Sequence, residues 1–297
     1  MKEHTENKEI THKAKSYTGV YALHKYWGKK PYNIISDFIK KYTKPYDIVL
    51  DPFSGSGVSV LEAVFNKRKG FGIDINPSAV FITEQLLSGI DPQSLAKEFS
   101  ALEADIKADI NELYVVKRDR GSYIGQNFLW ENNELTEIRY SNGGRKRITT
   151  YPEDSDLRLA DSFSINDIPY FFPKNAFFYN SRINTNNKDN ISELFTTRNL
   201  LALSVLHNRI EKIEDTLLKN IFLFCFTSAI GQASKMVFVI KRRNKTKEHA
   251  AVSHKKEIGS WVIGYWTPHE FFENNVWTCF ETRFKKILKA KKSNMQY

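Results

Sequence analysis

A short loop rich in glycine and serine is the part of this sequence whose residue types and spacing could do chemistry. It follows an apolar run that begins at Tyr46, and it reads Asp51, Pro52, Phe53, Ser54, Gly55, Ser56 and Gly57. Glycines at the carboxyl end of a strand let the backbone approach a ligand closely, and a helix that follows points its first amides at that ligand. The loop therefore predicts a ligand site, whereas a glycine–serine stretch without this context is an ordinary flexible turn.

An acidic residue ends the next apolar run, which extends from Gly70 to Asp74. A carboxylate at the end of a second parallel strand can accept hydrogen bonds from ribose hydroxyls, as in dinucleotide-binding folds. The sequence lacks G-x-G-x-x-G, which argues against NAD, and it lacks G-x-x-x-x-G-K-[ST], which argues against ATP. Asp51 and Asp74 together predict a site for a different ligand that contains a nucleoside.

The residues around these two acids predict a strand–helix–strand unit. The run 46–51 suits a buried parallel strand, 58–65 suits the start of a helix, and 70–74 suits a second strand. Asn76 can cap the following helix, with Pro77 at its first position. Elements in this order form a βαβ unit, so both strands are expected in one parallel sheet.

The remainder of the chain predicts further helices and strands. Apolar residues spaced by three and four predict a long helix that begins at Pro92. Turn signals, including Asn132–Asn133, predict one or two β-hairpins within 114–160. We also expect helices over 191–213 and 215–231, strands over 236–240 and 261–266, a basic loop over 241–256 and a basic helix over 280–292.

Composition narrows the class of protein and its partners. The chain has 297 residues, of which 41% are hydrophobic, so it is long and apolar enough to bury a core. Two cysteines without a C-x-x-C pair exclude a disulfide framework and a cysteine zinc site, and no metal is expected. The sequence shows neither a signal peptide nor a membrane span, so we expect a cytoplasmic protein. A net charge of +10 favours a nucleic-acid partner, although a soluble basic surface would also account for it.

The loop and the second acid together resemble a known family. The sequence D-P-F-S-G-S-G, followed by Gly72 to Pro77, resembles the cofactor loop and second-strand motif of DNA methyltransferases that modify exocyclic amino groups. Upstream, the segment from His24 to Pro31 resembles the one that closes the methionine end of the pocket in these enzymes. The resemblance implies an α/β, Rossmann-like methyltransferase fold that is incomplete here and carries a β-hairpin and a helical insertion.

The same resemblance implies a cofactor, its contacts and a domain organisation. The cofactor is S-adenosylmethionine: the glycine loop cradles its methionine part, and Asp74 holds its ribose. The implied cofactor-binding residues are Lys25, Tyr26, Trp27, Asp51, Pro52, Phe53, Ser54, Gly55, Ser56, Gly57, Asp74, Ile75 and Asn76. The expected parts are a polar arm (1–18), a cofactor-binding βαβ part (19–113), a hairpin and loop insertion (114–190) and a helical region with a basic C-terminal helix (191–297).

The catalytic tetrapeptide of this family does not occur in the sequence. It consists of Asp, Asn or Ser, then Pro-Pro, then an aromatic residue, and Asp167-Ile168-Pro169-Tyr170 is the nearest imitation. No catalytic residue is therefore assigned. We expect a split or truncated methyltransferase that acts on DNA with a second polypeptide, which carries the tetrapeptide. A half sheet would also leave an unpaired edge for that partner to cover.

Three alternatives to this function remain open. The chain could belong to an RNA amino-methyltransferase, which can share the same loop, although no RNA-binding module is evident. It could be a non-catalytic subunit that binds S-adenosylmethionine or DNA. It could also be an inactive relic of a longer gene.

Overall fold

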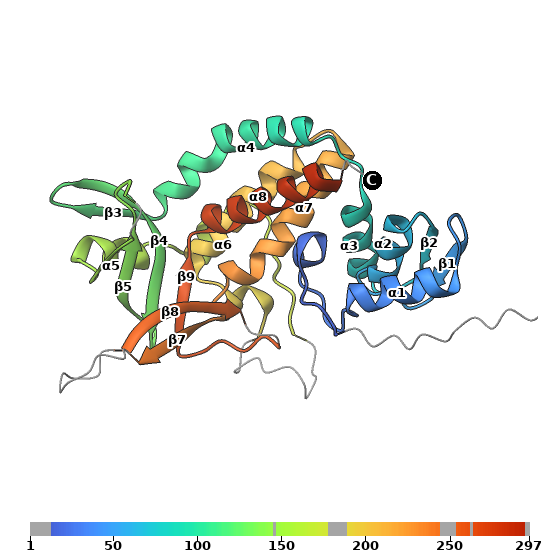
Figure 1. Cartoon of the computed structure of the whole chain (residues 1–297). Helices are drawn as coiled ribbons and strands as arrows, with labels where there is room; N and C mark the ends of the chain where they lie inside the picture. Colours follow the sequence, from blue (N-terminus) through green and yellow to red (C-terminus); the bar gives the residue numbers. More distant parts are fainter. Residues whose placement is uncertain (1–12, 145–146, 178–188, 244–253, 262–263, 295–297) are drawn as a thin grey trace, which may run out of the picture. The chain divides into compact units, whose positions relative to one another are not determined.

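A computed structural model describes residues 13–144, 147–177, 189–243, 254–261 and 264–294. The chain divides into two compact units: unit 1 comprises Met1–Leu95 with Lys286–Tyr297, and unit 2 comprises Ala96–Lys285. The two units together contain helices and both parallel and antiparallel strands, so the predicted α/β class is confirmed at the level of a mixed α/β protein (Figure 1). The domain boundaries expected at 18/19, 113/114 and 190/191 stay predictions.

Unit 1 is built on the strand–helix–strand unit that the sequence predicts. Strand β1 (Ile48–Asp51), helix α2 (Val58–Phe65) and strand β2 (Lys69–Gly72) follow one another, and the two strands pair in parallel. Helix α2 lies so close to the sheet that a Cβ on Gly70 would approach the Val60 carbonyl oxygen to 2.8 Å. Glycine in β2 is therefore a packing requirement of this unit.

The other helices of unit 1 begin and end where local signals place them. A short 3₁₀ helix (Gly19–Ala22) and helix α1 (Tyr32–Tyr42) precede β1, and helix α3 (Pro77–Leu87) follows β2. The predicted cap of α3 is confirmed, since the Asn76 side chain accepts a hydrogen bond from the Ser78 amide at 3.0 Å.

A lysine from the far end of the chain closes α3. The Nζ atom of Lys291 donates hydrogen bonds to the carbonyl oxygens of Gln85 at 2.6 Å and Ser88 at 2.7 Å. These carbonyls lie at the carboxyl end of the helix, where cations satisfy unpaired acceptors. Burial lowers the pKa of Lys291 to about 8.

Unit 2 contains a seven-stranded antiparallel sheet in the order β6-β5-β4-β9-β7-β8, with β3 pairing to β4. The bounds of its strands are β3 Val115–Arg118, β4 Gly121–Glu131, β5 Glu134–Tyr140, β6 Ile148–Thr150, β7 Val237–Arg243, β8 His254–Trp261 and β9 Glu270–Asn274. The predicted hairpin at Asn132–Asn133 is confirmed: both residues have positive φ and connect β4 to β5.

Helices pack together beside this sheet. Their bounds are α4 Pro92–Glu112, α5 Asp154–Asp161, α6 Thr197–Glu211, α7 Thr216–Ile230 and α8 Val276–Asn294, with 3₁₀ turns at Ile165–Asp167, Ile191–Leu194 and Gly231–Ala233. Aromatic rings join three of them: Phe99 of α4 stacks on Phe284 of α8 at 3.8 Å between centroids, and Phe222 of α7 lies 5.8 Å from Phe284. No helix within the described ranges is long and apolar enough to cross a membrane.

Two predictions near the end of the chain were wrong. A strand was expected over 261–266, but among its described residues only Trp261, the last residue of β8, lies in a strand. Gly264 and Tyr265 have positive φ, which an extended strand does not tolerate. The basic loop expected over 241–256 is flanked by strands, since β7 extends to Arg243 and β8 begins at His254. The positions 244–253 of that loop lie outside the described residues.

Two further elements were missed or mislocated. Strand β9 was not expected, because Glu270 to Asn274 are mostly buried without the alternation of a strand that has one exposed face. Helix α8 begins at Val276 rather than at Phe280, since the Asn275 side chain accepts from the Thr278 amide at 3.0 Å and so caps an earlier start. The region expected to be helical therefore contributes three strands as well.

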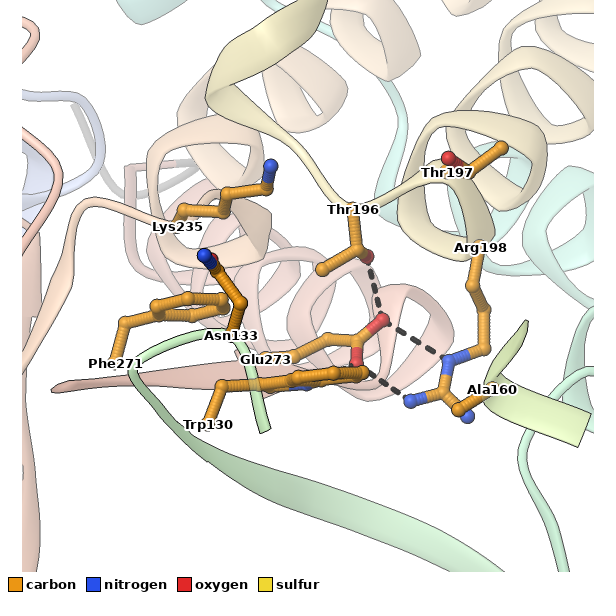
Figure 2. A pocket seen from close by; sticks show the side chains of 9 residues that line it. All are labelled: Trp130, Asn133, Ala160, Thr196, Thr197, Arg198, Lys235, Phe271 and Glu273. Carbon is orange, nitrogen blue, oxygen red and sulfur yellow. Dashed lines mark hydrogen bonds and ion pairs between the residues drawn. The ribbon is translucent and has the colours of Figure 1, made fainter. Parts of the chain in front are cut away.

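A buried ion pair joins α6 to β9 in unit 2. Arg198 and Glu273 are both almost fully buried, and the carboxylate of Glu273 also accepts from the Thr196 hydroxyl at 2.5 Å and the Trp130 indole at 2.8 Å (Figure 2). Burial by itself would raise the pKa of Glu273, but Arg198 and these hydrogen bonds hold it below the ordinary value of 4.5. The carboxylate is therefore charged and saturated with donors.

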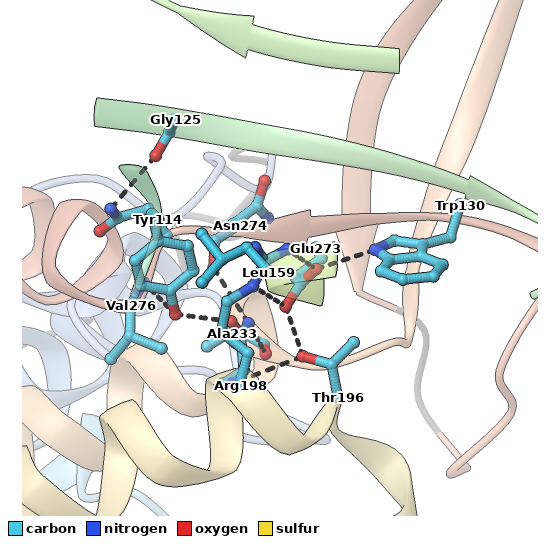
Figure 3. A network of polar contacts seen from close by, with 12 residues as sticks. Tyr114, Gly125, Trp130, Leu159, Thr196, Arg198, Ala233, Glu273, Asn274 and Val276 are labelled. Carbon is cyan, nitrogen blue, oxygen red and sulfur yellow. Dashed lines mark hydrogen bonds and ion pairs between the residues drawn. The ribbon is translucent and has the colours of Figure 1, made fainter. Parts of the chain in front are cut away.

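The polar network continues from this ion pair into the core. The Tyr114 hydroxyl donates to the Asn199 side chain at 2.6 Å, and that amide donates to the carbonyl oxygens of Ala233 at 2.8 Å and Asn274 at 3.0 Å (Figure 3). The guanidinium of Arg198 also lies 4.0 Å from the centroid of the Phe128 ring. Each of these contacts joins segments that are distant in sequence, so the network fixes how the sheet and helices of unit 2 pack.

Removing the cation of this pair is expected to destabilise unit 2. The substitution Arg198→Met leaves the Glu273 carboxylate buried without its counter-charge, which costs about 3–5 kcal/mol of unfolding free energy. Urea unfolding followed by tryptophan fluorescence measures the loss. Arg158→Met is the matched control, because Arg158 is exposed on α5. Equal effects of the two substitutions would contradict a stabilising role for the pair.

Candidate functional site

The glycine loop at the end of β1 is held in shape by the acid that precedes it. The carboxylate of Asp51 accepts hydrogen bonds from the Phe53 amide at 3.0 Å and from the Ser59 hydroxyl on α2. The loop ends at Gly57, whose φ of +74° is the left-handed conformation that glycine adopts without strain. A Cβ on Gly57 would also lie 2.3 Å from the Thr83 side chain, so this position has no room for another residue.

The carboxyl ends of β1 and β2 lie side by side. The Ile73 amide donates to the Asp51 carbonyl oxygen at 2.9 Å, and the Ser54 amide donates to the Ile73 carbonyl oxygen at 3.0 Å. The carboxylate of Asp74 then accepts from the Gly55 amide at 2.8 Å and from the Asn76 amide at 2.9 Å. The glycine loop and the second acid, which the sequence placed on separate strands, therefore form one constellation.

A cavity of about 380 Å³ opens beside this loop in unit 1. Its volume falls at the lower end of the range of small-molecule sites, roughly 300–1,000 Å³. The residues that line it are Tyr26, Gly28, Lys29, Lys30, Ile35, Asp51, Phe53, Ser54, Gly55, Ser56, Val58 and Ser59. The cavity is thus formed by the glycine loop, the start of α2, Ile35 of α1 and the segment upstream of α1.

One polar atom in this cavity lacks a partner. Ser56 is only 3% exposed, and its Oγ atom has no hydrogen-bond partner among the described residues. Leaving a buried hydroxyl unpaired costs on the order of 1–3 kcal/mol. A ligand that donates to or accepts from Ser56 would remove this cost, so the hydroxyl marks a place for a polar ligand group.

The segment upstream of α1 is anchored to the rest of unit 1 by buried contacts. The Tyr21 hydroxyl donates to the Glu62 carboxylate on α2, and the Tyr21 ring stacks on Tyr32 with centroids 4.7 Å apart. The Nζ atom of Lys29 donates to the carbonyl oxygens of Tyr21 at 2.8 Å and His24 at 2.7 Å, and burial lowers the pKa of Lys29 to about 8. These contacts hold the segment as a wall of the cavity.

Tyr26 is the residue of this segment that meets the glycine loop. A Cβ built on Gly55 would lie 3.2 Å from the Tyr26 ring, and Gly55 itself has a φ of +51°. A side chain at position 55 would therefore press against the Tyr26 ring and would also be strained by the positive φ. Tyr26 and Gly55 are both among the residues expected to bind the cofactor, and the structure brings them into contact.

The other residues expected to bind the cofactor divide into those that line the cavity and those that do not. Asp51, Phe53, Ser54 and Ser56 line it, whereas Lys25, Trp27, Pro52, Gly57, Asp74, Ile75 and Asn76 do not. Asp74 reaches the cavity through its hydrogen bond to Gly55, and Ile75 is fully exposed beyond the end of β2. Their role in cofactor binding stays a prediction.

The sequence did not single out several residues that line the cavity. They are Gly28, Lys29, Lys30, Ile35, Val58 and Ser59. Lys29 and Lys30 lie within the segment 24–31 that carried the resemblance, so their position was indicated even though their contacts were not. Ser59 offered no such signal, because its contact with Asp51 depends on the fold of the loop.

The nearest imitation of the catalytic tetrapeptide does not follow a strand. Asp167 ends a short 3₁₀ turn in unit 2, and Ile168 to Tyr170 follow it without a preceding strand. The family geometry implied by the resemblance requires that motif at the end of a strand beside the cofactor. Asp167 therefore gains no support as a catalytic residue.

A second cavity, of about 180 Å³, lies in unit 2 beside the buried ion pair (Figure 2). Trp130, Arg198 and Glu273 form part of its wall. The charged groups of this wall already pair with each other, and the Glu273 carboxylate is held deprotonated. Its geometry serves packing rather than acid–base chemistry.

Comparisons with known proteins agree with the resemblance drawn from the motifs. Residues 2–85 match a family model described as DNA methylase. The chain is also 35% identical over 78 residues to the Type II methyltransferase M.MjaII of Methanocaldococcus jannaschii, a match that covers 26% of this chain and 15% of that protein. No solved structure matches the chain. The matched residues 2–85 include the βαβ unit, so this part of the chain is similar to the DNA methylase family, in agreement with the resemblance drawn from its motifs.

Proposed function

We propose that this chain binds S-adenosylmethionine at the carboxyl edge of β1 and β2, as a component of a methyltransferase that modifies the exocyclic amino group of adenine or cytosine in DNA. The observation that carries the proposal is the hydrogen bond from the Gly55 amide to Asp74, which unites the glycine loop with the second-strand acid. The match of residues 2–85 to DNA methylases supports the same reading.

The residues of the cavity suit the groups that this cofactor carries. S-adenosylmethionine has an ammonium, a carboxylate, a ribose and an adenine, and it supplies a methyl group on a positively charged sulfur. Asp51 offers a carboxylate for the ammonium, and Ser56 offers its unpaired hydroxyl to the amino-acid part. Asp74 offers a carboxylate for the ribose hydroxyls. The residues present therefore fit the group.

The upstream segment has a separate task in this proposal. Lys29 holds the carbonyls of Tyr21 and His24, and so keeps Tyr26 against Gly55 at the methionine end of the cavity. A wall fixed in this way excludes water from the bound amino-acid part and limits the directions it can take. Lys25 and Trp27 belong to the same segment and share its expected role.

The sequence lacks the motif that orients the target amino nitrogen in the family that it resembles. None of its nine prolines is followed by another proline, so the tetrapeptide with Pro-Pro and an aromatic residue does not occur in the sequence. We therefore assign methyl-donor binding to this chain and orientation of the base to a second polypeptide. In this view the βαβ unit is the first part of a Rossmann-like sheet that the partner completes, and DNA is the substrate of the assembly.

The net charge of +10 supports a nucleic-acid substrate, and the match of residues 2–85 to DNA methylases favours DNA. Lysines and arginines that neutralise phosphates release counterions, which favours binding at low salt. RNA amino-methylation has no feature of the described residues in its favour. Cofactor binding without methyl transfer, even with candidate partners present, would instead support a non-catalytic subunit.

Removing the charge of Asp74 should weaken binding of S-adenosylmethionine. Asp74→Asn keeps the shape of the side chain but loses the carboxylate that accepts hydrogen bonds, and we expect at least a tenfold weaker affinity by calorimetry, or about 1.4 kcal/mol. Asp47→Asn is the matched control, because Asp47 is an exposed acid at the other end of β1 that accepts from the Lys44 amide. An unchanged affinity in Asp74→Asn would exclude this acid from the site.

Filling the contact between Gly55 and Tyr26 should block the cavity. In Gly55→Val the new side chain would meet the Tyr26 ring at 3.2 Å and would be strained at a φ of +51°. We expect calorimetry to detect no binding of S-adenosylmethionine. Gly89→Val is the control, since a Cβ at Gly89 meets no atom within 4 Å. Binding that survives in Gly55→Val would show that the ligand does not enter here.

The purified chain should bind the cofactor without transferring its methyl group. Tritiated S-adenosylmethionine and DNA are incubated with the chain alone, and calorimetry measures binding on the same preparation. We expect binding but no tritium in DNA, because the sequence lacks the Pro-Pro-aromatic tetrapeptide that would orient the amino group. Robust labelling of DNA by the chain alone would contradict the proposal that a second polypeptide is needed for methyl transfer.

A further inference from the structure

One face of the two-stranded sheet in unit 1 is apolar and exposed. Side chains of neighbouring strand residues point to opposite faces, and α2 covers the face that contains Gly70. The opposite face carries Ile48, Leu50, Phe71 and Ile73, with exposed fractions of 66%, 60%, 54% and 59%. We call these four residues the open face. Leu50 and Phe71 are paired in the ladder, so the open face is continuous across both strands.

Such a face is unusual for strands that pair in parallel. Parallel sheets are ordinarily covered on both faces, because the connections between their strands run over them. In the described part of the chain, β1 and β2 pair only with each other, so both outer edges of this sheet also lack a neighbouring strand. Large apolar side chains together with open strand edges indicate a surface that another polypeptide covers.

The direction of the strands indicates the kind of strand that can be added. A second copy related by a two-fold axis would bring its own strand alongside in the antiparallel direction. A strand that extends the present sheet in parallel therefore does not come from such a copy, and no other strand of the described residues pairs with β1 or β2. Such a strand would end at the same edge as Asp51, since the carboxyl ends of parallel strands lie together. Its first loop residues would then lie beside the cavity.

The charges beside the open face indicate the chemistry of its partner. Lys69 pairs with Ile48 in the ladder and therefore stands on the same face, and it is exposed. Lys67, also exposed, lies just before β2. A partner that is apolar at its centre and acidic opposite these lysines complements the surface.

We propose that the open face of β1 and β2 is the docking surface for a second, different polypeptide. This partner adds a parallel strand to the sheet, lays an apolar surface with an acidic margin over Leu50 and Phe71, and carries the Pro-Pro-aromatic tetrapeptide at the end of its strand. The identity of the tetrapeptide rests on the proposed function, whereas the docking surface rests on the exposed residues themselves.

A photo-crosslinker placed on the open face tests which molecule covers it. The full chain is produced in cells of its source organism with p-benzoylphenylalanine at position 50, and crosslinked products are identified by mass spectrometry after irradiation. Position 217 is the matched control, because Leu217 lies on α7 and is 64% exposed, against 60% for Leu50. The expected product at position 50, absent at position 217, joins this chain to a polypeptide that contains the tetrapeptide.

Every other product at position 50 overturns the proposal. A crosslink to a second copy would show a homodimer, and a crosslink within the same chain would show that another part of the chain covers the face. A crosslink to a polypeptide without the tetrapeptide, or no crosslink at all, would remove the proposed partner.

A substitution then measures how much the open face contributes to the complex. Leu50→Lys places a charge at its centre and should weaken binding of the purified, crosslink-identified polypeptide at least tenfold, whereas Leu217→Lys should leave the affinity unchanged. Far-ultraviolet circular dichroism checks that both variants fold. Equal affinities for Leu50→Lys and the unsubstituted chain would overturn the proposal.

Calorimetry with S-adenosylmethionine on the unsubstituted chain separates this proposal from the proposed function. Crosslinking at position 50 without any cofactor binding would leave the docking surface standing and remove the methyl-donor site. Cofactor binding without the expected crosslink would leave the methyl-donor site standing and remove the docking surface.

Discussion

The parallel pairing of β1 with β2 is the constraint on which the proposed site depends. Because parallel strands end at the same edge, pairing Asp51 with Gly72 brings the glycine loop and Asp74 within one hydrogen bond of each other. The close packing of α2 against Gly70 holds the register, and the positive φ of Gly57 lets the chain turn from loop to helix in the space left by Thr83. A cavity follows from this geometry only because Lys29 and Tyr21 tie the upstream segment against it.

Unit 2 uses a different kind of constraint. Its sheet is antiparallel, and its most demanding interaction is a pair of buried charges between α6 and β9. An unpaired charge in that position would be costly, so only arrangements in which Arg198 meets Glu273 are allowed. The Trp130 indole on β4 and the hydroxyl of Thr196, which caps the helix that carries Arg198, also donate to Glu273, so β4 must lie beside this pair as well. In unit 2 the buried ion pair thus restricts how the strands and helices can pack. In unit 1 the parallel pairing of β1 with β2 and the close contacts at its glycines restrict the packing instead.

The parts of the fold that local signals determine could be predicted from the sequence. The run into Asp51, the glycines and the Asn76–Pro77 helix start gave β1, α2, β2 and α3 with small errors at their ends. Strand β9 could not be predicted, because it lies in the interior of the sheet between β4 and β7. These neighbouring strands come from other parts of the sequence, so its local pattern does not reveal them. The same holds for the wall of the cavity, since the Lys29 contacts involve carbonyl oxygens that no side-chain pattern reveals.

The contact of Lys291 with the end of α3 has a consequence for the order in which the protein is made. Unit 1 is assembled from two pieces of chain, 1–95 and 286–297, with all of unit 2 encoded between them. Lys291 follows Ser88 by 203 positions. At about 5–20 residues per second, a ribosome therefore needs on the order of 10–40 seconds after α3 before it adds the lysine that caps this helix. During that interval the carboxyl end of α3 must rely on water for its hydrogen bonds. The amino-terminal unit thus begins synthesis first, yet it acquires its last stabilising contact after unit 2 has been translated in full.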